Sequence, residues 1–216
     1  MTLRIIDLVL KKKKSLKAYT LFAGGGGLHL GLEKAGIEVL VASDINENSK
    51  NTHKKNWPKL PFIKKDCRLL TSEELLIAAD GVKPNIMAGG PPCQGFSTIG
   101  DKLSSDPRND LFSSFLRLAK ELNPEVILIE NVKTITTMYD GRFSSWIKKQ
   151  LHEMGYRVYL KVLNAADYGA PQLRHRAIFI GTKYDSDFEF PTPTHGINTN
   201  VPYKTVRDAI SDLINL

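Results

Sequence analysis

The chain has 216 residues, of which 42% are hydrophobic, enough for one substantial folded domain with an appendage. It contains no apolar run of the roughly 20 residues that a membrane-spanning helix needs, and its start does not resemble a secretory signal. Two cysteines do not make a disulfide framework, so we expect a protein of the reducing cytoplasm. The net charge of +7 favours a polyanionic partner such as nucleic acid, although a lysine-rich surface also serves solubility alone.

Residues 1–17 precede the first predicted strand and include four consecutive lysines at 11–14. We expect a basic N-terminal arm, either solvated or in contact with phosphates. Order begins with an alternation of short apolar runs and segments of helical spacing. The predicted strands of the first half cover residues 18–22, 37–43, 61–63 and 86–88. Its predicted helices cover residues 28–35, 47–56 and 71–79.

The second half continues this alternation. Helices are predicted over residues 111–122 and 144–154, and strands over 125–129, 156–163 and 176–182. Residues 101–110 indicate an exposed loop, residues 191–202 an irregular linker, and residues 205–216 the beginning of a further helix. Strands that alternate with helices, with apolar central strands, predict an α/β, Rossmann-like fold. In such a fold a mostly parallel sheet has helices on both faces.

A glycine-rich loop, Phe22-Ala23-Gly24-Gly25-Gly26-Gly27, joins the first predicted strand to the first helix. Glycines there let a ligand approach the backbone, and the helix N-terminus presents free N–H groups. Asp44 and Asp66 end the next two strands, where an acid commonly binds ribose hydroxyls or an adenine amino group. Each aspartate alone could be a loop or cap residue. Together, and without a P-loop motif, they favour a nucleoside that has no phosphate chain.

A stiff turn, Gly-Gly-Pro-Pro-Cys-Gln-Gly-Phe-Ser, occupies residues 89–97 after the strand at 86–88. Its prolines have a restricted φ, and glycines on both sides let the chain bend around them. A strand that ends in such a loop suits a nucleophile, so Cys93 is the candidate. A lone cysteine is otherwise a buried small hydrophobe, which is our interpretation of Cys67.

Two further groups of polar residues accompany strands. Glu130 and Asn131 follow the strand at 125–129, at the rim where open α/β sheets place their active sites; an acid facing water is the alternative. Arg174 and Arg176 enter the last predicted strand two residues apart, so they face the same side in an extended chain. Two such guanidiniums suit a phosphate or a base carbonyl, and a surface charge pair is the alternative.

These motifs, in this order and spacing, strongly resemble the DNA (cytosine-5)-methyltransferases. The intervening Asp-Pro-Arg-Asn-Asp-Leu-Phe at residues 106–112 and Asn-Ala-Ala-Asp-Tyr-Gly-Ala-Pro at residues 164–171 belong to the same pattern. The resemblance covers about residues 18–216. It implies an enzyme that transfers a methyl group from S-adenosylmethionine to C5 of a cytosine flipped out of double-stranded DNA.

The resemblance also implies roles for the site residues. Cys93 is matched to the thiolate that adds to C6, and Glu130 to the acid that contacts the ring, with Asn131 holding its turn. Arg174 and Arg176 are matched to arginines near the cytosine carbonyl. Gln94 and Ser97 fall on the loop that closes over the flipped base. The residues matched to the cofactor site are Phe22, Ala23, Gly24, Gly25, Gly26, Gly27, Asp44, Ile45, Asp66, Pro92 and Leu111. No metal site is expected.

The resemblance has one departure, at the end of the chain. Family members continue into a target-recognition domain and return with a last helix that completes the cofactor site, whereas this chain stops at Leu216. We therefore expect a basic arm at 1–17, a catalytic domain at 18–190, and a linker and the start of a helix at 191–216. We also expect a second polypeptide with the missing parts, in a bacterial, nucleoid-associated enzyme.

Three alternatives remain open on the sequence. The first is a tRNA-methylating member of the same family, although the turn at residues 94–97 fits the bacterial DNA enzymes better. The second is an inactive remnant that only binds DNA or its partner. The third is a dinucleotide oxidoreductase, suggested by the glycine loop alone, which leaves Cys93, Glu130 and the arginines unexplained.

Overall fold

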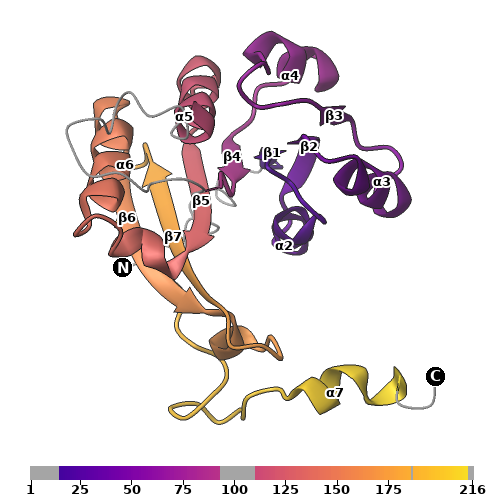
Figure 1. The fold of residues 1–216 in the computed structure, drawn as a ribbon, viewed down its shortest axis with the longest axis vertical. Helices are drawn as coiled ribbons and strands as arrows, with labels where there is room; N and C mark the ends of the chain where they lie inside the picture. Colours follow the sequence, from indigo (N-terminus) through magenta and orange to yellow (C-terminus); the bar gives the residue numbers. More distant parts are fainter. Residues whose placement is uncertain (1–14, 93–109, 186, 214–216) are drawn as a thin grey trace.

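The computed structural model describes residues 15–92, 110–185 and 187–213. Its centre is a seven-stranded sheet in the order β3-β2-β1-β4-β5-β7-β6 (Figure 1). The strands are β1 (Lys17–Leu21), β2 (Glu38–Asp44), β3 (Phe62–Lys64), β4 (Ile86–Gly89), β5 (Val126–Val132), β6 (Arg157–Asn164) and β7 (His175–Thr182).

The helices connect successive strands. They are α2 (Gly27–Lys34), α3 (Glu47–Asn56), α4 (Ser72–Ala78), α5 (Asp110–Leu122), α6 (Arg142–Glu153) and α7 (Val206–Ile210). Short 3-10 helices, which the sequence did not predict, are η2 (Lys133–Thr136), η3 (Ala165–Tyr168) and η4 (Ser211–Leu213). No helix of the described ranges is both long and apolar enough to cross a membrane.

The sheet is mostly parallel, as predicted. Strands β1 to β5 pair in parallel, whereas β7 runs antiparallel to both β5 and β6. The chain adds strands on one side of β1 as far as β3, then crosses to β4 and adds strands on the other side. The carboxyl ends of β1 and β4 therefore lie at a topological switch point, where open α/β sheets bind their ligands.

Helices cover both faces of the sheet, because successive strand residues point to opposite sides. Tyr19 and Leu21 of β1 pack in a cluster with residues of α4, α5 and α6. Ala18, the residue before Tyr19, points to the opposite face and packs in a second cluster with Leu32 of α2. These clusters confirm the predicted α/β architecture.

Local sequence explains where several helices begin. Asn46 accepts a hydrogen bond from the backbone of Asn48 at 2.7 Å and caps α3. Thr71 and Glu74 form the predicted capping box at the start of α4. Gly36, with φ of 77°, follows the end of α2 in the left-handed conformation.

Two boundaries differ from the prediction. Strand β5 continues to Val132, so Glu130 and Asn131 lie within the strand and not after it, because the antiparallel pairing with β7 extends to Val132 opposite Arg176. The helix expected over 205–216 is shorter: α7 covers Val206–Ile210, η4 follows it, and residues 214–216 lie outside the described part. Figure 1 shows α7 lying apart from the sheet. Residues 1–14 of the arm predicted at 1–17, and most of the loop at 101–110, also lie outside the described ranges, and Lys17 of that arm belongs to β1.

Candidate active site

A cavity of about 140 Å³ lies at the carboxyl ends of the first strands. It receives residues from the loops after β1, β2 and β3, from the turn after β4 and from the start of α5. Its lining residues are Leu21, Phe22, Ser43, Asp44, Ile45, Lys65, Asp66, Cys67, Arg68, Pro92 and Leu111. We call it the first cavity. Its position at the switch point and its mixture of apolar side chains and carboxylates suit a nucleoside.

Phe22, the first residue of the glycine-rich loop, has an unusual backbone conformation. Its φ of 54° lies in the left-handed region, which a bulky non-glycine residue rarely adopts. Such strain persists only where the surrounding structure imposes it, and it is concentrated at functional sites. The ring lies 6.5 Å from that of Phe115 on α5, so it forms an aromatic wall of the first cavity.

Asp44, at the end of β2, connects the glycine loop to the next loop. Its Oδ2 accepts a hydrogen bond from the backbone N–H of Gly24 at 2.9 Å, and its Oδ1 accepts one from Asn46 at 2.9 Å. Each carboxylate oxygen has a further lone pair, so both can still accept hydrogen bonds from ligand hydroxyls. The same carboxylate thus shapes the loop and faces the cavity.

Asp66, after β3, is held by Arg68. The Arg68 guanidinium donates to Oδ2 at 2.5 Å and Nε donates to Oδ1 at 3.1 Å, and these hydrogen bonds lower the pKa of Asp66. Cys67 lies between them and is 7% exposed. Burial raises the pKa of its thiol to about 12, so it remains protonated and unreactive, in agreement with its interpretation as an inert hydrophobe.

A second cavity, of about 330 Å³, adjoins the first. It is lined by Gly90, Pro91, Pro92, Glu130, Asn131, Val132, Arg174 and Arg176. Pro92 lines both cavities, so the two cavities meet at this residue. Two ligands that must meet at one bond would be brought together by this arrangement.

Glu130 is the acid of the second cavity, and two arginines contact it. Arg176 Nε lies 2.7 Å from Glu130 Oε1, and Arg174 lies 3.9 Å from the same oxygen. The two guanidiniums therefore face the same side, as the extended-chain argument predicts. Arg176 is the more buried partner, since its side chain is 24% exposed against 48% for Arg174.

Asn131 stabilises the turn opposite Glu130. It is buried, and its Nδ2 donates to the carbonyl of Pro91 at 2.8 Å, while its Oδ1 accepts from the N–H of Val132 at 2.9 Å. The backbone of the turn is thus fastened to β5 at Pro91. Gly90 lies so close to Glu130 that a Cβ there would be 3.2 Å from Oε2.

The structure brings together many of the residues selected from the sequence. Six line the first cavity (Phe22, Asp44, Ile45, Asp66, Pro92 and Leu111), and four others line the second together with Pro92 (Glu130, Asn131, Arg174 and Arg176). Ala23 and Gly24–Gly27 do not line the first cavity, although Gly24 is bonded to its Asp44. Cys93, Gln94 and Ser97 lie outside the described residues.

Sequence reasoning missed several lining residues. In the first cavity these are Leu21, Ser43, Lys65, Cys67 and Arg68, and in the second Gly90, Pro91 and Val132. Each lies within two residues of a selected one, so the signal available was the position of a strand end and its following loop. The sequence does not indicate which side chains of these loops face the cavity, because that depends on how each backbone turn folds.

Fold and cavities together define an α/β, Rossmann-like protein with one cavity at the switch point of its sheet and a second cavity that holds an acid and two arginines. The sequence matches the family of C-5 cytosine-specific DNA methylases over residues 16–215, and the chain belongs to this family.

Similar proteins agree with this assignment. Type II methyltransferase M1.HphI of Haemophilus parahaemolyticus is 40% identical over 199 residues, which are 91% of this chain and 52% of that protein. M.AquIA of Picosynechococcus sp. is 36% identical over 219 residues, which are 91% of this chain and 88% of that protein. Among solved structures, Dnmt2 methyltransferase of S. pombe has a TM-score of 0.66 and 26% identity, over 81% of this chain and 52% of that one. The chain thus spans about half the length of M1.HphI, but most of the length of M.AquIA.

Proposed function

We propose that this chain is the catalytic part of a DNA (cytosine-5)-methyltransferase, with residues 18–190 as the catalytic domain. The observation that carries the proposal is the pair of adjoining cavities with Pro92 between them. One suits the nucleoside of S-adenosylmethionine, and the other presents Glu130 and the arginines to a base. The residue that follows Pro92 in the chain is Cys93.

The first cavity fits S-adenosylmethionine by its donor set. Phe22 supplies an aromatic face for the adenine, Asp44 supplies free lone pairs for the ribose hydroxyls, and Asp66 supplies a carboxylate for the adenine amino group. Ala23 and Gly24–Gly27 would receive the methionine part, next to Asp44. When bound, the cofactor supplies an electrophilic methyl group on a sulfonium.

In the second cavity the chain's own residues would activate cytosine, whose C5 is a poor nucleophile. The Cys93 thiolate forms a bond to C6, and electron density moves through the ring so that C5 can accept the methyl group. A base or a water molecule then takes the C5 proton, and the electron pair of that C–H bond restores the ring double bond as the C6–S bond breaks and the thiolate leaves. Each bond made to the cysteine is therefore broken again within one cycle.

Glu130 would contact the ring N3 and the exocyclic amino group and so stabilise the adduct. Its orientation is set by Arg176, which holds Oε1 at 2.7 Å. Asn131 fastens the turn that precedes Cys93. Arg174 and Arg176 would also face the cytosine carbonyl, and Gln94 and Ser97 would belong to the loop that covers the flipped base.

We also propose that a second polypeptide supplies the DNA-reading domain and a further wall of the cofactor site. Two observations support this. M.AquIA, of which this chain covers 88%, shows that a curated Type II methyltransferase has nearly the same extent. In addition, the linker and α7 expose large apolar side chains, at Ile197, Val206, Ile210 and Leu213. The place of action would be the bacterial cytoplasm, at the nucleoid.

Covalent trapping tests the chemistry directly. The chain is incubated with S-adenosylmethionine and an oligonucleotide that contains 5-fluorocytosine, with and without the presumed partner. Fluorine cannot leave C5 as the proton does, so the Cys93–C6 adduct persists and is detected as a shifted band. Cys93→Ser should abolish the band. A band that survives this substitution contradicts the nucleophile assignment.

The same preparations show whether DNA or tRNA is the substrate, and whether the chain needs a second polypeptide. Methyl transfer is measured on duplex DNA and on tRNA, and DNA should be the better acceptor. Trapping of tRNA alone would favour the tRNA-methylating alternative. Full site-specific methylation by the purified chain would contradict the second polypeptide.

A further inference from the structure

One wall of the first cavity is a turn that is held by residues outside the cavity. Lys65, Asp66, Cys67 and Arg68 are consecutive and all line the cavity. The segment 65–71 lies between β3 and α4 and contains neither strand nor helix. Backbone hydrogen bonds shape its middle, from the N–H groups of Leu69 and Leu70 to the carbonyl of Asp66 at 2.9 and 3.1 Å. Side-chain contacts from α4 and α5 add to these bonds and hold its ends.

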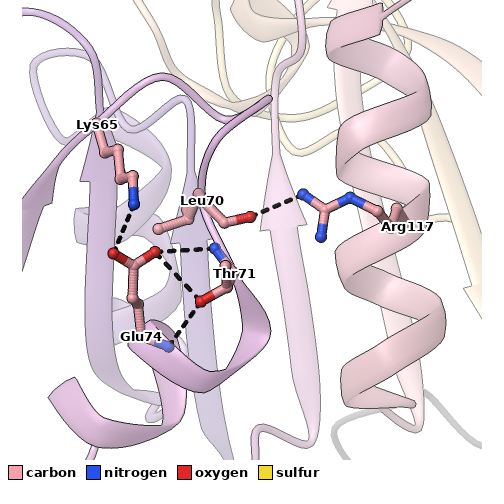
Figure 2. A network of polar contacts seen from close by, with 5 residues as sticks. All are labelled: Lys65, Leu70, Thr71, Glu74 and Arg117. Carbon is pink, nitrogen blue, oxygen red and sulfur yellow. Dashed lines mark hydrogen bonds and ion pairs between the residues drawn. The ribbon is translucent and has the colours of Figure 1, made fainter.

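Glu74, on the first turn of α4, holds both ends of this segment (Figure 2). Its Oε2 accepts a hydrogen bond from the backbone N–H of Thr71 at 3.0 Å, and its Oε1 lies 2.6 Å from Nζ of Lys65. Hydrogen bonds from Lys65 and Thr71 lower the pKa of Glu74, so the carboxylate is ionised at neutral pH. One side chain thus connects the first residue of the turn to the last.

Arg117, from the middle of α5, holds the same turn from a second element (Figure 2). Its guanidinium donates to the backbone carbonyl of Leu70 at 2.7 Å. The Leu70 side chain is fully buried in the core, and this burial also anchors the segment. The other side of the guanidinium lies 3.2 Å from Glu121, so the arginine has a fixed orientation.

Charge gives Glu74 a second effect. The first cavity is lined by two carboxylates, Asp44 and Asp66, and two cations, Lys65 and Arg68. Arg68 is bonded to Asp66, and Glu74 compensates Lys65. Asp44 then remains as the uncompensated charge of the wall. A wall with this balance favours a cationic ligand, and S-adenosylmethionine carries its positive charge at the sulfonium.

We propose that Glu74 and Arg117, neither of which lines the cavity, are positioning residues for the cofactor: they hold segment 65–71 in the shape that forms the adenosine wall. The inference rests on the proposed function. It assigns to Glu74 the alignment and charge compensation of Lys65, and to Arg117 the fixed position of the Leu70 carbonyl.

The test is S-adenosylmethionine binding to the full chain by calorimetry, together with thermal unfolding. Glu74→Gln keeps a capping group but removes the charge beside Lys65, and Arg117→Ala removes the donor to Leu70. Each should weaken binding about fivefold to tenfold, the value of one typical hydrogen bond. The thermal unfolding midpoint of both variants should equal that of the control variants. Arg117→Lys, which retains a donor, should recover most of the affinity.

Two matched controls lie on the same helices. Glu73→Gln makes the same charge change one residue from Glu74, at an exposed position, and Lys120→Ala removes an exposed cation from α5. Neither should change the affinity. Affinity at the wild-type level in Glu74→Gln and Arg117→Ala would overturn this inference alone, whereas a wild-type chain that does not bind S-adenosylmethionine even with the presumed partner present would overturn the proposed function as well. A loss of affinity that only accompanies a lower unfolding midpoint would also overturn it.

Discussion

The two cavities of this protein are built in different ways. The first is enclosed by loops that follow successive parallel strands, and its walls are joined by hydrogen bonds such as Gly24 to Asp44 and Arg117 to Leu70. The second lies where the sheet changes to antiparallel pairing, and its acid and arginines come from β5 and the segment entering β7. Under the proposed function, the first cavity would hold the cofactor, whose shape is constant, and the second would present its acid and arginines to the base of a large substrate.

This contrast implies that substitutions in the second cavity should affect the chemistry, whereas substitutions in the first should affect cofactor affinity. Glu130→Gln should make the largest difference. The amide keeps the shape and can accept from Arg176, but it cannot act as an acid or base, so methyl transfer should fall by about 10²–10⁴-fold. Binding of S-adenosylmethionine should be unchanged in calorimetry.

Glu38→Gln is the matched control for that variant. Glu38 lies at the other end of the sheet, in an exposed ion pair with Lys17, and pairs of this kind contribute little. Equal loss of cofactor affinity and of turnover in Glu130→Gln would show that the two cavities do not act separately.

Asp44→Asn tests the first cavity. An amide can accept from only one of the two N–H groups that Asp44 now binds, Gly24 and Asn46, and it presents a donor to the other. We expect S-adenosylmethionine affinity to fall about tenfold to a hundredfold, with turnover at saturating cofactor much less affected. Asp80→Asn, at an exposed loop residue with φ of 51° that asparagine also tolerates, provides the control. An Asp44→Asn variant that binds S-adenosylmethionine normally but turns over slowly would contradict the assignment of Asp44 to cofactor binding.

Gly90→Ala tests how closely the proline turn approaches the acid. The added Cβ would lie 3.2 Å from Glu130 Oε2, which should push the carboxylate from its position beside Arg176. Turnover should fall about tenfold, while cofactor affinity and the unfolding midpoint stay near the wild-type values. In Gly31→Ala, on α2, the new Cβ meets nothing within 4 Å. That control should keep full activity and gain about 0.5–1 kcal/mol of stability.

The smallest effect concerns pH and lies near the glycine loop. His29 is 1% exposed, and its ring stacks on Trp57 at 4.1 Å. Burial lowers the pKa of His29; Glu33 opposes this, and neighbouring His53 adds to it. The unfolded chain then binds the proton more tightly, so the free energy of unfolding should be highest above pH 6.5 and should fall by about 1 kcal/mol or less as the pH decreases below it.

Urea unfolding at pH 7.5 and pH 5.5 measures this change, and an NMR titration of the imidazole reports the His29 pKa itself. His152→Gln, at an exposed position on α6, should leave the pH dependence as it is. A His29 pKa at or above 6.5 would contradict the assignment of burial as the dominant cause.

Much of the fold could be predicted because its signals are local. The strand and helix order followed from hydrophobic periodicity, and the Thr71–Glu74 box marked the start of α4. The end of β5 could not be predicted, because Glu130 and Asn131 continue a strand only where β7 pairs with them. For the same reason, the sequence placed Glu130 at the sheet edge without indicating that Arg176 would hold it.

The sequence by itself determined the α/β class, the family resemblance and ten residues that line the two cavities, because motifs at strand ends are fixed by spacing along the chain. Only the tertiary structure decided that Pro92 separates the cavities, that Asp44 bonds the glycine loop, and that Arg117 reaches Leu70 across 47 positions of sequence. The physical reason is that hydrogen bonds between loops depend on where each strand lies in the sheet, and strand order is a property of the folded chain.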